Sequence, residues 1–591
     1  MSLQWHFELV AEDCPLYKLP FPLIVGRAER QAETPVDEQV INDSRPELMD
    51  RVQSRFQRVS MSVEAARVRL IPPLALSQRV EADNGGPDDW TFLRRPALLG
   101  FLAILSICIG ASLPGSPFKT DLAGTWFFGD PSASNPGQTF LLLPGVVAVY
   151  GGMILFIRVW FGLVQALRYR PGAPIRTLAA MMAVWIVPLL VVAPLFSKDV
   201  YSYAAQGEMM SHHINPYDYG PGTIGFGPYT AGVGNLWLNT PAPYGPFFLM
   251  LAGWAASLSG HNALVTVELL RIMSVAGVAL IAYCIPKLAR AYGMDPGKAF
   301  AVALLNPLTL LALIGGAHND AIMVGLLVAG VTAAKYRHPV VGIVLCTLAA
   351  AIKVPAAIGI VYVAWDWTGP DVELRQRVKP LVKGGLIAVA VMAVLSFVSG
   401  LGWGWIANLG TPDAVRSWMA PATAVGLVFS GALHVLHIGV SLGGVLTITR
   451  LLGLIAATVI AGYCLLHKEA MGTLTALGVT ALAFVLLGPV VQPWYLTWGI
   501  ILMAPVVSGR LRTLVLGLSI VAPFIGLTGG ASLLKQLLAT NPAAMVVAVF
   551  VLWGVVMVPL GHWTSSWRID RSRLGSALSA PSGAVSAAFE S

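Results

Sequence analysis

The chain has 591 residues, of which 56% are hydrophobic and only 12% are charged, and its mean hydropathy is +0.71. Soluble globular domains carry about 25% charged residues, so this composition excludes a soluble enzyme and indicates a protein that crosses a membrane many times. The formal net charge of +8 comes mostly from Lys and Arg in short loops, where basic residues orient membrane proteins, and it predicts no nucleic-acid partner.

The two ends of the chain differ from its apolar middle. Residues 1–95 are rich in charge and proline, and they contain neither a run long enough to span a bilayer nor a signal-peptide pattern. We therefore expect a cytoplasmic N-terminal extension. Residues 567–591 turn basic and then Ser- and Ala-rich, which is typical of a disordered tail, here on the cytoplasmic side. Residues 96–566 are expected to form one transmembrane domain.

Apolar segments recur throughout this domain and predict an all-α polytopic transmembrane bundle of about 13 to 15 spans, since one bilayer crossing takes about 20 apolar residues. The segments lie near residues 97–113, 140–166, 177–196, 263–286, 299–314, 319–334, 339–352, 354–366, 382–400, 443–466, 471–489, 494–508, 512–530 and 543–561. The two short segments on either side of Lys353 are expected to be a broken or re-entrant pair.

Basic residues give the expected orientation. When the spans alternate from a cytoplasmic N-terminus, nearly all Lys- and Arg-rich loops fall on the cytoplasmic side. Both termini are then cytoplasmic, and residues 197–262 face the cell exterior. Nucleotide sugars and ATP are not available there, and the sequence has no phosphate loop. Chemistry on this face therefore needs a donor that a lipid delivers.

The segment after the third span, SKDVYSYAAQGEMMSHHINPYDYGP, is unusually polar for a membrane loop. Ser197 is a suitable N-cap for a helix over residues 198–210 at the membrane surface. Asp199 then lies in the first turn, on the same face as Tyr203. A carboxylate there can accept a proton from a hydroxyl, while the helix N-terminus favours its ionised form. In the alternative interpretation, Asp199 only stabilises the end of the helix.

Aromatic residues follow in INPYDYGP and NTPAPYGPFF, where prolines and glycines predict an ordered path that is not helical. Tyr217, Tyr219, Trp237 and Tyr244 offer flat surfaces of the kind on which sugars stack. The same residues suit an interfacial aromatic belt, and this alternative stays open.

Two further clusters lie at ends of apolar segments. His318, Asn319 and Asp320 follow LIGGA, and ionisable residues at membrane depth suggest function because they are costly to place there. A tight-turn cap is their simpler explanation. Lys353 either extends its ammonium to the membrane surface or meets an anion such as a lipid phosphate. The same two interpretations apply to two arginines inside spans, Arg271 and Arg450.

Other polar groups carry weaker signals. Glu268 precedes Arg271 by three residues, so an internal salt bridge is the leading alternative for that arginine. A third outer boundary contains Gln492, Trp494 and Tyr495.

No metal site is predicted. His434 and His437 have helical spacing but no third ligand nearby, and His212 and His213 are adjacent, so their side chains would diverge on a helix. The five scattered cysteines predict neither a disulfide framework nor a metal site.

Five motifs carry a family resemblance. In their order and setting, SKDVYSYAAQG, INPYDYGP, APYGP, LNPL and GGAHND resemble the actinobacterial polyprenol-phosphomannose-dependent α-1,6-mannosyltransferases, over about residues 97–565. The resemblance implies the GT-C glycosyltransferase architecture in the plasma membrane, with an extracytoplasmic active site. It also implies polyprenyl-phosphate mannose as donor and, as acceptor, a glycolipid mannan of the lipomannan and lipoarabinomannan backbone. No cofactor is expected, although some GT-C enzymes use a divalent cation.

Carried onto this chain, the resemblance makes Asp199 the general base that deprotonates the acceptor hydroxyl. A β-linked donor that gives an α-linked product requires inversion, so one base suffices and no covalent nucleophile is needed. The leaving lipid phosphate needs positive or hydrogen-bonding groups, for which we consider Lys353, His318, Arg271 and Arg450, in that order. The candidates for contact with sugar or acceptor are Tyr203, Tyr217, Tyr219, Tyr244, Trp237, Asp320, Gln492, Trp494 and Tyr495.

Two alternatives stay open from the sequence. A transporter or flippase of polyprenyl-linked glycans would explain Lys353 and the short apolar segments, but not the aromatic, carboxylate-bearing outer segment. A GT-C enzyme that uses another polyprenyl-phosphate sugar, such as arabinose or glucose, would share the fold and the mechanism. The family's base usually lies in the first outer loop, whereas counting the spans places Asp199 in the second.

Overall fold

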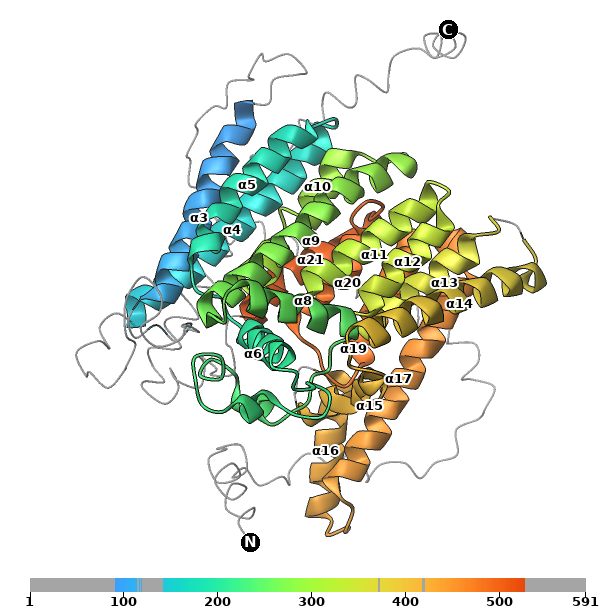
Figure 1. Ribbon diagram of the computed structural model, residues 1–591. Coiled ribbons are helices and arrows are strands. Elements are labelled where there is room, and N and C mark those ends of the chain that lie inside the picture. Colours follow the sequence, from blue (N-terminus) through green and yellow to red (C-terminus); the bar gives the residue numbers. More distant parts are fainter. Residues whose placement is uncertain are drawn as a thin grey trace, which may run out of the picture. The chain divides into compact units, whose positions relative to one another are not determined.

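Figure 1 shows the computed structural model, which describes residues 91–113, 116, 118, 142–369, 372–416 and 420–526. Every regular element in these ranges is helical, as the composition predicts. Several predicted regions lie wholly or mostly outside the described residues: the N-terminal extension, the loop at 114–139, the last apolar segment at 543–561 and the tail from 567.

The helices have the following bounds. In the first half they are α3 (Arg94–Ser112), α4 (Leu142–Tyr169), α5 (Ile175–Val191), α6 (Asp199–Ser211), α7 (Asn235–Leu238), α8 (Pro246–Leu258), α9 (Ala263–Ala291) and α10 (Pro296–Ala303). In the second half they are η6 (Thr309–Gly315), α11 (Asp320–Lys335), α12 (Pro339–Ala350), η7 (Val354–Ala357), α13 (Ile358–Asp366), α14 (Leu374–Val398), α15 (Gly404–Ala407), η8 (Asn408–Ala414), α16 (Pro421–Val435), α17 (Leu442–Leu466), α18 (Lys468–Met471), α19 (Thr473–Leu487), η9 (Pro493–Tyr495), α20 (Leu496–Met503) and α21 (Gly509–Gly526).

Five of the described helices are long and apolar enough to cross a membrane. They are α3 with the short turn before it, α4, α9, α14 and α17. The pair η6 and α11 adds a sixth span if it counts as one, although it bends by 116° at its break. Seven shorter apolar helices have 10–17 residues. The described part of the chain therefore contains fewer full-length spans than the 13 to 15 predicted, because several apolar segments are interrupted.

Apolar side chains cover the outward faces of α14 and α17. On α14, Phe397 is 87% exposed and Leu386 is 65% exposed, and Val459 on α17 is 66% exposed. Contiguous apolar surface of this extent is rare on soluble proteins, whereas lipid tails favour it. With the five spanning helices, it establishes a membrane protein.

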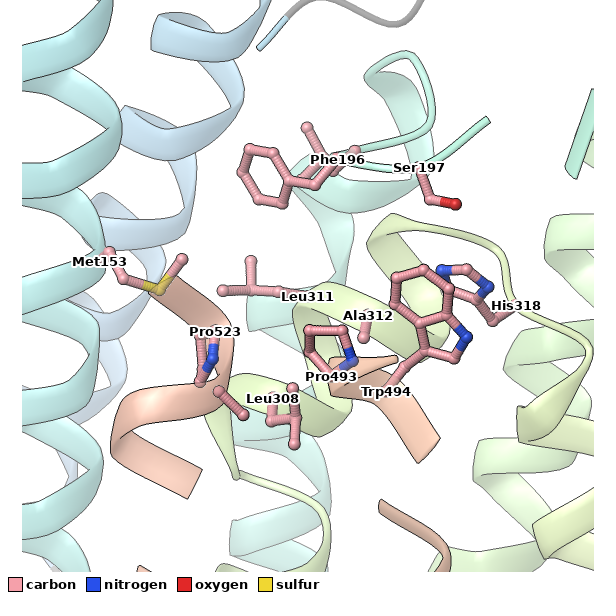
Figure 2. A pocket seen from close by; sticks show the side chains of 12 residues that line it. Met153, Phe196, Ser197, Leu308, Leu311, Ala312, His318, Pro493, Trp494 and Pro523 are labelled. Atoms are coloured by element: carbon pink, nitrogen blue, oxygen red, sulfur yellow. The ribbon is translucent and has the colours of Figure 1, made fainter. Parts of the chain in front are cut away.

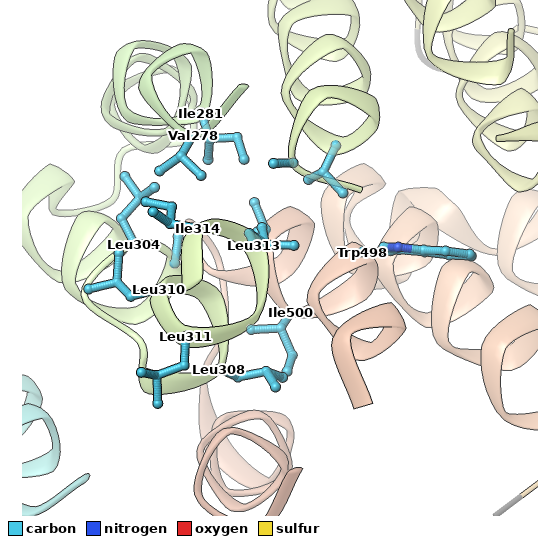
Figure 3. Packing of buried hydrophobic residues seen from close by; sticks show 14 of the residues in the cluster. Val278, Ile281, Leu304, Leu308, Leu310, Leu311, Leu313, Ile314, Trp498 and Ile500 are labelled. Atoms are coloured by element: carbon cyan, nitrogen blue, oxygen red, sulfur yellow. The ribbon is translucent and has the colours of Figure 1, made fainter. Parts of the chain in front are cut away.

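The core is densely packed around η6, a π-helical segment that lies between α9 and α20 (Figure 3). Leu313 and Ile314 of η6 are fully buried, as are Ile281 of α9 and Ile500 of α20. π-Helical segments often occur beside functional sites because they displace the residues that follow them. Here the chain turns sharply after η6, and Ala317 takes a left-handed conformation with φ of 52°.

Helix α6, which the sequence predicts at the membrane surface, is buried among other parts of the protein. Residues 200–209 are all buried, and α6 packs on α8 and α9 (Figure 1). Because neighbouring helices enclose this short helix, its first residue, Asp199, has a fixed position.

Candidate active site

Asp199 is the first residue of α6. The helix starts one residue later than predicted, and Lys198 takes the N-cap position. The Ser197 hydroxyl oxygen accepts the Asp199 backbone N–H at 3.1 Å, so Ser197 does satisfy one free donor at the helix start, as a capping side chain would. The Asp199 side chain is 26% exposed. It is therefore held at the edge of the core and remains accessible.

His318 brings an imidazole to this carboxylate. Its Nδ1 lies 3.5 Å from Asp199 Oδ2, which is long for a hydrogen bond. The imidazole stacks on the Trp494 indole, with ring centroids 3.9 Å apart and an interplanar angle of 22°. This stack, which joins the turn before α11 to η9, holds the ring of His318 towards Asp199.

Asp320 and Lys353 form a buried ion pair beside these residues. The Lys353 ammonium donates to both Asp320 carboxylate oxygens, at 2.9 and 3.0 Å. The Trp498 indole N–H donates to Asp320 Oδ1 at 2.7 Å. Asp320 is the first residue of α11. Lys353 lies in the break between α12 and η7, and the sequence predicted a break at this lysine. The carboxylate of Asp320 is thus fully committed to protein donors.

Aromatic rings enclose the Lys353 ammonium. It lies 4.5 Å from the Tyr495 ring centroid and 5.9 Å from that of Tyr244. Tyr203 packs edge-on against Tyr244 at 5.1 Å, and its hydroxyl donates to the Asn319 side-chain oxygen at 3.4 Å. Cations over aromatic faces are stabilised electrostatically, so these rings attract the Lys353 ammonium.

These surroundings change the acidity of Asp199. Burial raises the pKa of Asp199 to about 6, and the positive charge of Lys353 opposes this rise. The nearby Asp320 carboxylate adds to the rise, while hydrogen bonds with Ser197 and Tyr203 reduce it. A carboxylate with a pKa near neutrality combines two useful properties, because it is largely ionised at pH 7 and is a stronger base than an ordinary aspartate.

A narrow apolar pocket of about 30 Å³ reaches this cluster from the core side (Figure 2). Ser197, His318 and Trp494 form its polar end. The remaining lining residues are apolar and come from several helices: Met153, Leu195, Phe196, Leu308, Leu311, Ala312, Pro493, Ala522 and Pro523. The pocket thus connects the surroundings of Asp199 with an apolar interior.

Most of the candidate residues from the sequence meet here. Besides Asp199, they are His318, Asp320, Lys353, Tyr203, Tyr244, Trp494 and Tyr495. They come from five segments at or near helix ends and breaks, which are far apart in the chain. Trp498 was not among the candidates, although it follows Tyr495 by three residues and so shares its side of the helix.

Four other candidates take different positions. Tyr217 is buried in a separate small cluster, where its hydroxyl donates to the Tyr244 backbone oxygen at 2.8 Å. This contact supports the backbone of Tyr244 from behind. Tyr219 is 55% exposed, and Trp237 of α7 packs against the edge of the main core. Gln492 directly precedes η9.

Both arginines have partners within the protein, but the buried guanidinium nitrogens of Arg271 make no hydrogen bond in the described structure. Arg271 is fully buried in α9 and pairs with Glu268 Oε1 at 3.2 Å, as the simpler interpretation of the sequence proposed. Arg450 donates to the Thr423 hydroxyl and to the backbone oxygens of Asp413 and Val415. Neither guanidinium contacts the cluster around Asp199 in the described structure.

Comparison with known proteins identifies the family. A family model described as the N-terminal domain of α-(1→6)-mannopyranosyltransferase matches residues 97–369, which include Asp199, His318, Asp320 and Lys353. A second model, described as the MptB C-terminal domain, matches residues 422–558. No solved structure matches the chain.

Three curated relatives agree with these matches. A probable α-(1→6)-mannopyranosyltransferase of Mycolicibacterium smegmatis is 36% identical over 55% of this chain and 64% of its own length. An α-(1→6)-mannopyranosyltransferase of Mycobacterium tuberculosis is 34% identical over 54% of this chain and likewise 64% of its own length. The α-(1→6)-mannopyranosyltransferase A of the same organism is 31% identical, and the alignment covers 70% of this chain and 81% of that relative. This chain therefore belongs to the α-(1→6)-mannopyranosyltransferase family.

Proposed function

We propose that the chain is an inverting α-1,6-mannosyltransferase of the plasma membrane, with polyprenyl-phosphate mannose as its donor and Asp199 as its general base. The observation that carries this proposal is the environment of Asp199. It is an accessible carboxylate at a helix start, its pKa is about 6, and His318 lies beside it.

The reaction needs one proton acceptor. Asp199 takes the proton of the acceptor 6-hydroxyl while that oxygen attacks the anomeric carbon of the donor. The bond between this carbon and the phosphate oxygen breaks, and its electron pair leaves with the lipid phosphate. Asp320 is a poor second nucleophile, because Lys353 and Trp498 already occupy its carboxylate. One free base and one occupied carboxylate favour a single displacement with inversion over a double displacement.

The lipid chain and the phosphate of the donor correspond to two different parts of the site. The apolar pocket that ends at Ser197 and His318 has the kind of lining that an isoprenoid chain requires (Figure 2), although its volume of about 30 Å³ is smaller than one isoprene unit. His318 and Lys353 can stabilise the phosphate charge that develops on the leaving group. Arg271 and Arg450 pair with protein groups away from the cluster around Asp199 in the described structure, so we assign them structural roles.

The acceptor side is aromatic. Tyr244, Tyr495 and Trp498 surround the Lys353 ammonium, and Tyr203 packs edge-on against Tyr244. Such rings suit a mannan chain. The acceptor that we propose is a glycolipid α-1,6-mannan of the lipomannan and lipoarabinomannan backbone. The distribution of basic loops supports cytoplasmic termini and an extracytoplasmic site.

The test is transfer by the purified full-length protein in proteoliposomes, with radiolabelled polyprenyl-phosphate mannose and a synthetic α-1,6-mannoside. We expect the Asp199→Asn variant to lose about 10²–10⁴-fold in rate while it still binds donor. Asp218→Asn is the matched control, since Asp218 is exposed in the same outer segment and bonds only to Asn215 among the described contacts.

The outcomes separate the alternatives. Undiminished transfer by Asp199→Asn would refute the assignment of the base. Movement of labelled lipid across the bilayer without any transfer would instead support a flippase, which the broken helices at Lys353 and before α11 also suit. Parallel reactions with polyprenyl-phosphate arabinose and glucose test the identity of the sugar.

A further inference from the structure

A second polar cluster lies at the far end of α6. The Glu208 carboxylate is held between two imidazoles, with Oε1 at 3.0 Å from His212 Nε2 and Oε2 at 3.0 Å from His261 Nδ1. The carboxylate is buried, with 9% of its side chain exposed, whereas the imidazoles of His212 and His261 are 56% and 49% exposed. None of the groups in the site around Asp199 takes part in this cluster.

The fold builds the cluster from two elements. Glu208 and His212 are four residues apart at the end of α6, so they share one face of the helix. His261 comes from the turn between α8 and α9, where its φ of 61° is left-handed. The two imidazoles stack with their centroids 5.4 Å apart. Three side chains thus converge, although the sequence places one of them 53 residues from Glu208.

Two histidines and one glutamate form a recognised zinc ligand set. Here one ligand atom from each of the three residues lies within 4.8 Å of the other two. Ligand atoms about 2.1 Å from a tetrahedral zinc ion lie about 3.4 Å apart, so side-chain rotations that shorten the distances between these atoms by at most about 1.4 Å admit the ion. Imidazole ligands favour zinc over Ca²⁺ and Mg²⁺, which prefer oxygen.

An open cavity provides the remaining coordination position. It has a volume of about 410 Å³ and is lined by Glu208, His212 and residues of the following segment, including Tyr229 and Thr230. The Ser211 hydroxyl donates to Glu208 Oε2 at 3.3 Å, which is the kind of contact that orients a metal ligand. The cavity admits water or a hydroxyl of a bound glycan as the fourth ligand.

We propose that Glu208, His212 and His261 bind a divalent transition-metal ion, for which Zn²⁺ is the best fit, and that this ion clamps the end of α6 to the start of α9. Glu208 follows Asp199 by nine positions on the same helix, a rise of about 13.5 Å. The metal is therefore not a ligand of the reacting sugar at Asp199. The proposal does not depend on the proposed mannosyl transfer, because metal binding is measured without any substrate.

The test uses the purified full-length protein with a tag that contains no histidine. After treatment with chelator and desalting, Zn²⁺ is added as the probe, and bound metal is measured by mass spectrometry and by competition with a chromogenic chelator. We expect one bound ion per wild-type chain and a rise in Tm on addition of Zn²⁺, because a ligand that binds the folded state stabilises it.

Variants identify the ligands. His261→Ala and Glu208→Gln should each weaken Zn²⁺ binding by at least about tenfold and abolish the rise in Tm. Glu208→Gln keeps the shape of the side chain, so it still tests whether this cluster binds zinc if His261→Ala does not fold. His213→Ala is the matched control, since His213 neighbours His212 but lies outside the cluster, and it should bind zinc like the wild type.

The opposite results overturn the proposal. If the wild type retains no zinc at micromolar free ion, or if His261→Ala and His213→Ala bind it equally, Glu208 serves only as a counter-ion for the two imidazoles.

Discussion

Lys353 and Asp320 form a buried ion pair that joins two helix breaks 33 residues apart in the chain. Asp320 is fully buried and the Lys353 side chain is 11% exposed. His318 lies within the first break, between η6 and α11, so the pair also fixes the loop that carries this imidazole towards Asp199. The position of His318 beside Asp199 thus depends on the ion pair between Lys353 and Asp320, in which neither His318 nor Asp199 takes part.

Removing one partner of this pair should destabilise the protein strongly. Lys353→Met leaves the Asp320 carboxylate with Trp498 as its remaining described donor, and an uncompensated buried charge costs about 3–5 kcal/mol. Asp320→Asn should have a similar effect through Lys353. The double variant should be more stable than either single variant, because it buries no unpaired charge.

Thermal unfolding of the purified variants measures this coupling. Lys379→Met is the control, since Lys379 is an exposed residue of α14, and its Tm should match that of the wild type. Simple additivity of the two single substitutions would show that the ion pair does not couple the breaks.

The rate of transfer should depend on pH through Asp199. A general base acts in its ionised form, and burial raises the pKa of Asp199 to about 6. Above that pH the base is ionised, and the ionisation of Asp199 should no longer change kcat/KM. Below it, kcat/KM should fall by about tenfold per pH unit, because one proton inactivates the base.

The pH profile of transfer in proteoliposomes checks this expectation. The residual activity of Asp199→Asn should lack the acidic limb, while Asp218→Asn should keep it. A limb centred near pH 4, the usual range of an aspartate, would contradict the effect of burial that we derive.

Local signals in the sequence predicted much of this site. Asp199 was placed at a helix start because a capping residue and an apolar run flank it, and Lys353 was placed in a helix break because it divides two short apolar halves. Both expectations rest on neighbouring residues, and the structure has both features. The buried α6 was not expected, because its enclosure depends on α8 and α9.

Contacts between distant segments could not be predicted. The pairing of Lys353 with Asp320 and the stack of His318 on Trp494 arise only when the helices pack. His212 was set aside as a metal ligand because its neighbour His213 diverges from it, whereas its partners are Glu208, one turn earlier, and His261. The i, i+4 spacing of Glu208 and His212 was the available signal.

Gly245 should not tolerate a side chain. A Cβ at this position would lie 2.2 Å from the Ala351 backbone oxygen, and the Gly245 N–H donates to the Ile352 oxygen at 3.0 Å. This close approach places Tyr244 beside the break that carries Lys353. Because a backbone atom cannot rotate away, Gly245→Ala should cost at least about 1–3 kcal/mol and also slow transfer.

The Tm and the transfer rate of Gly245→Ala test this close approach. Gly151→Ala in α4 is the control, since no heavy atom lies within 4 Å of its Cβ position and alanine favours a helix over glycine. A wild-type Tm and rate for Gly245→Ala would mean that the two backbones are further apart.

Arg450 should contribute to the stability of the fold and not to the affinity for the donor. Its guanidinium donates to the Asp413 and Val415 backbone oxygens at 2.7 Å each and to the Thr423 hydroxyl at 3.0 Å. It thereby ties α17 to α16 and to the segment before it. Arg450→Gln should lower the Tm, because hydrogen bonds to a charged group contribute about 1.5–3 kcal/mol each. Arg450→Lys should recover little, because an ammonium cannot reproduce the planar set of donors.

Donor affinity separates this role from binding of the lipid phosphate. We expect folded Arg450→Gln to bind polyprenyl-phosphate mannose with the wild-type Kd and to keep the same pH profile. The exposed residue Arg375 provides the control, and Arg375→Gln should change neither Tm nor Kd. The opposite result is a loss of donor affinity in Arg450→Gln at an unchanged Tm. It would mean that the Arg450 guanidinium of the wild type binds the donor phosphate, as one interpretation of the sequence predicts, and does not stabilise the fold.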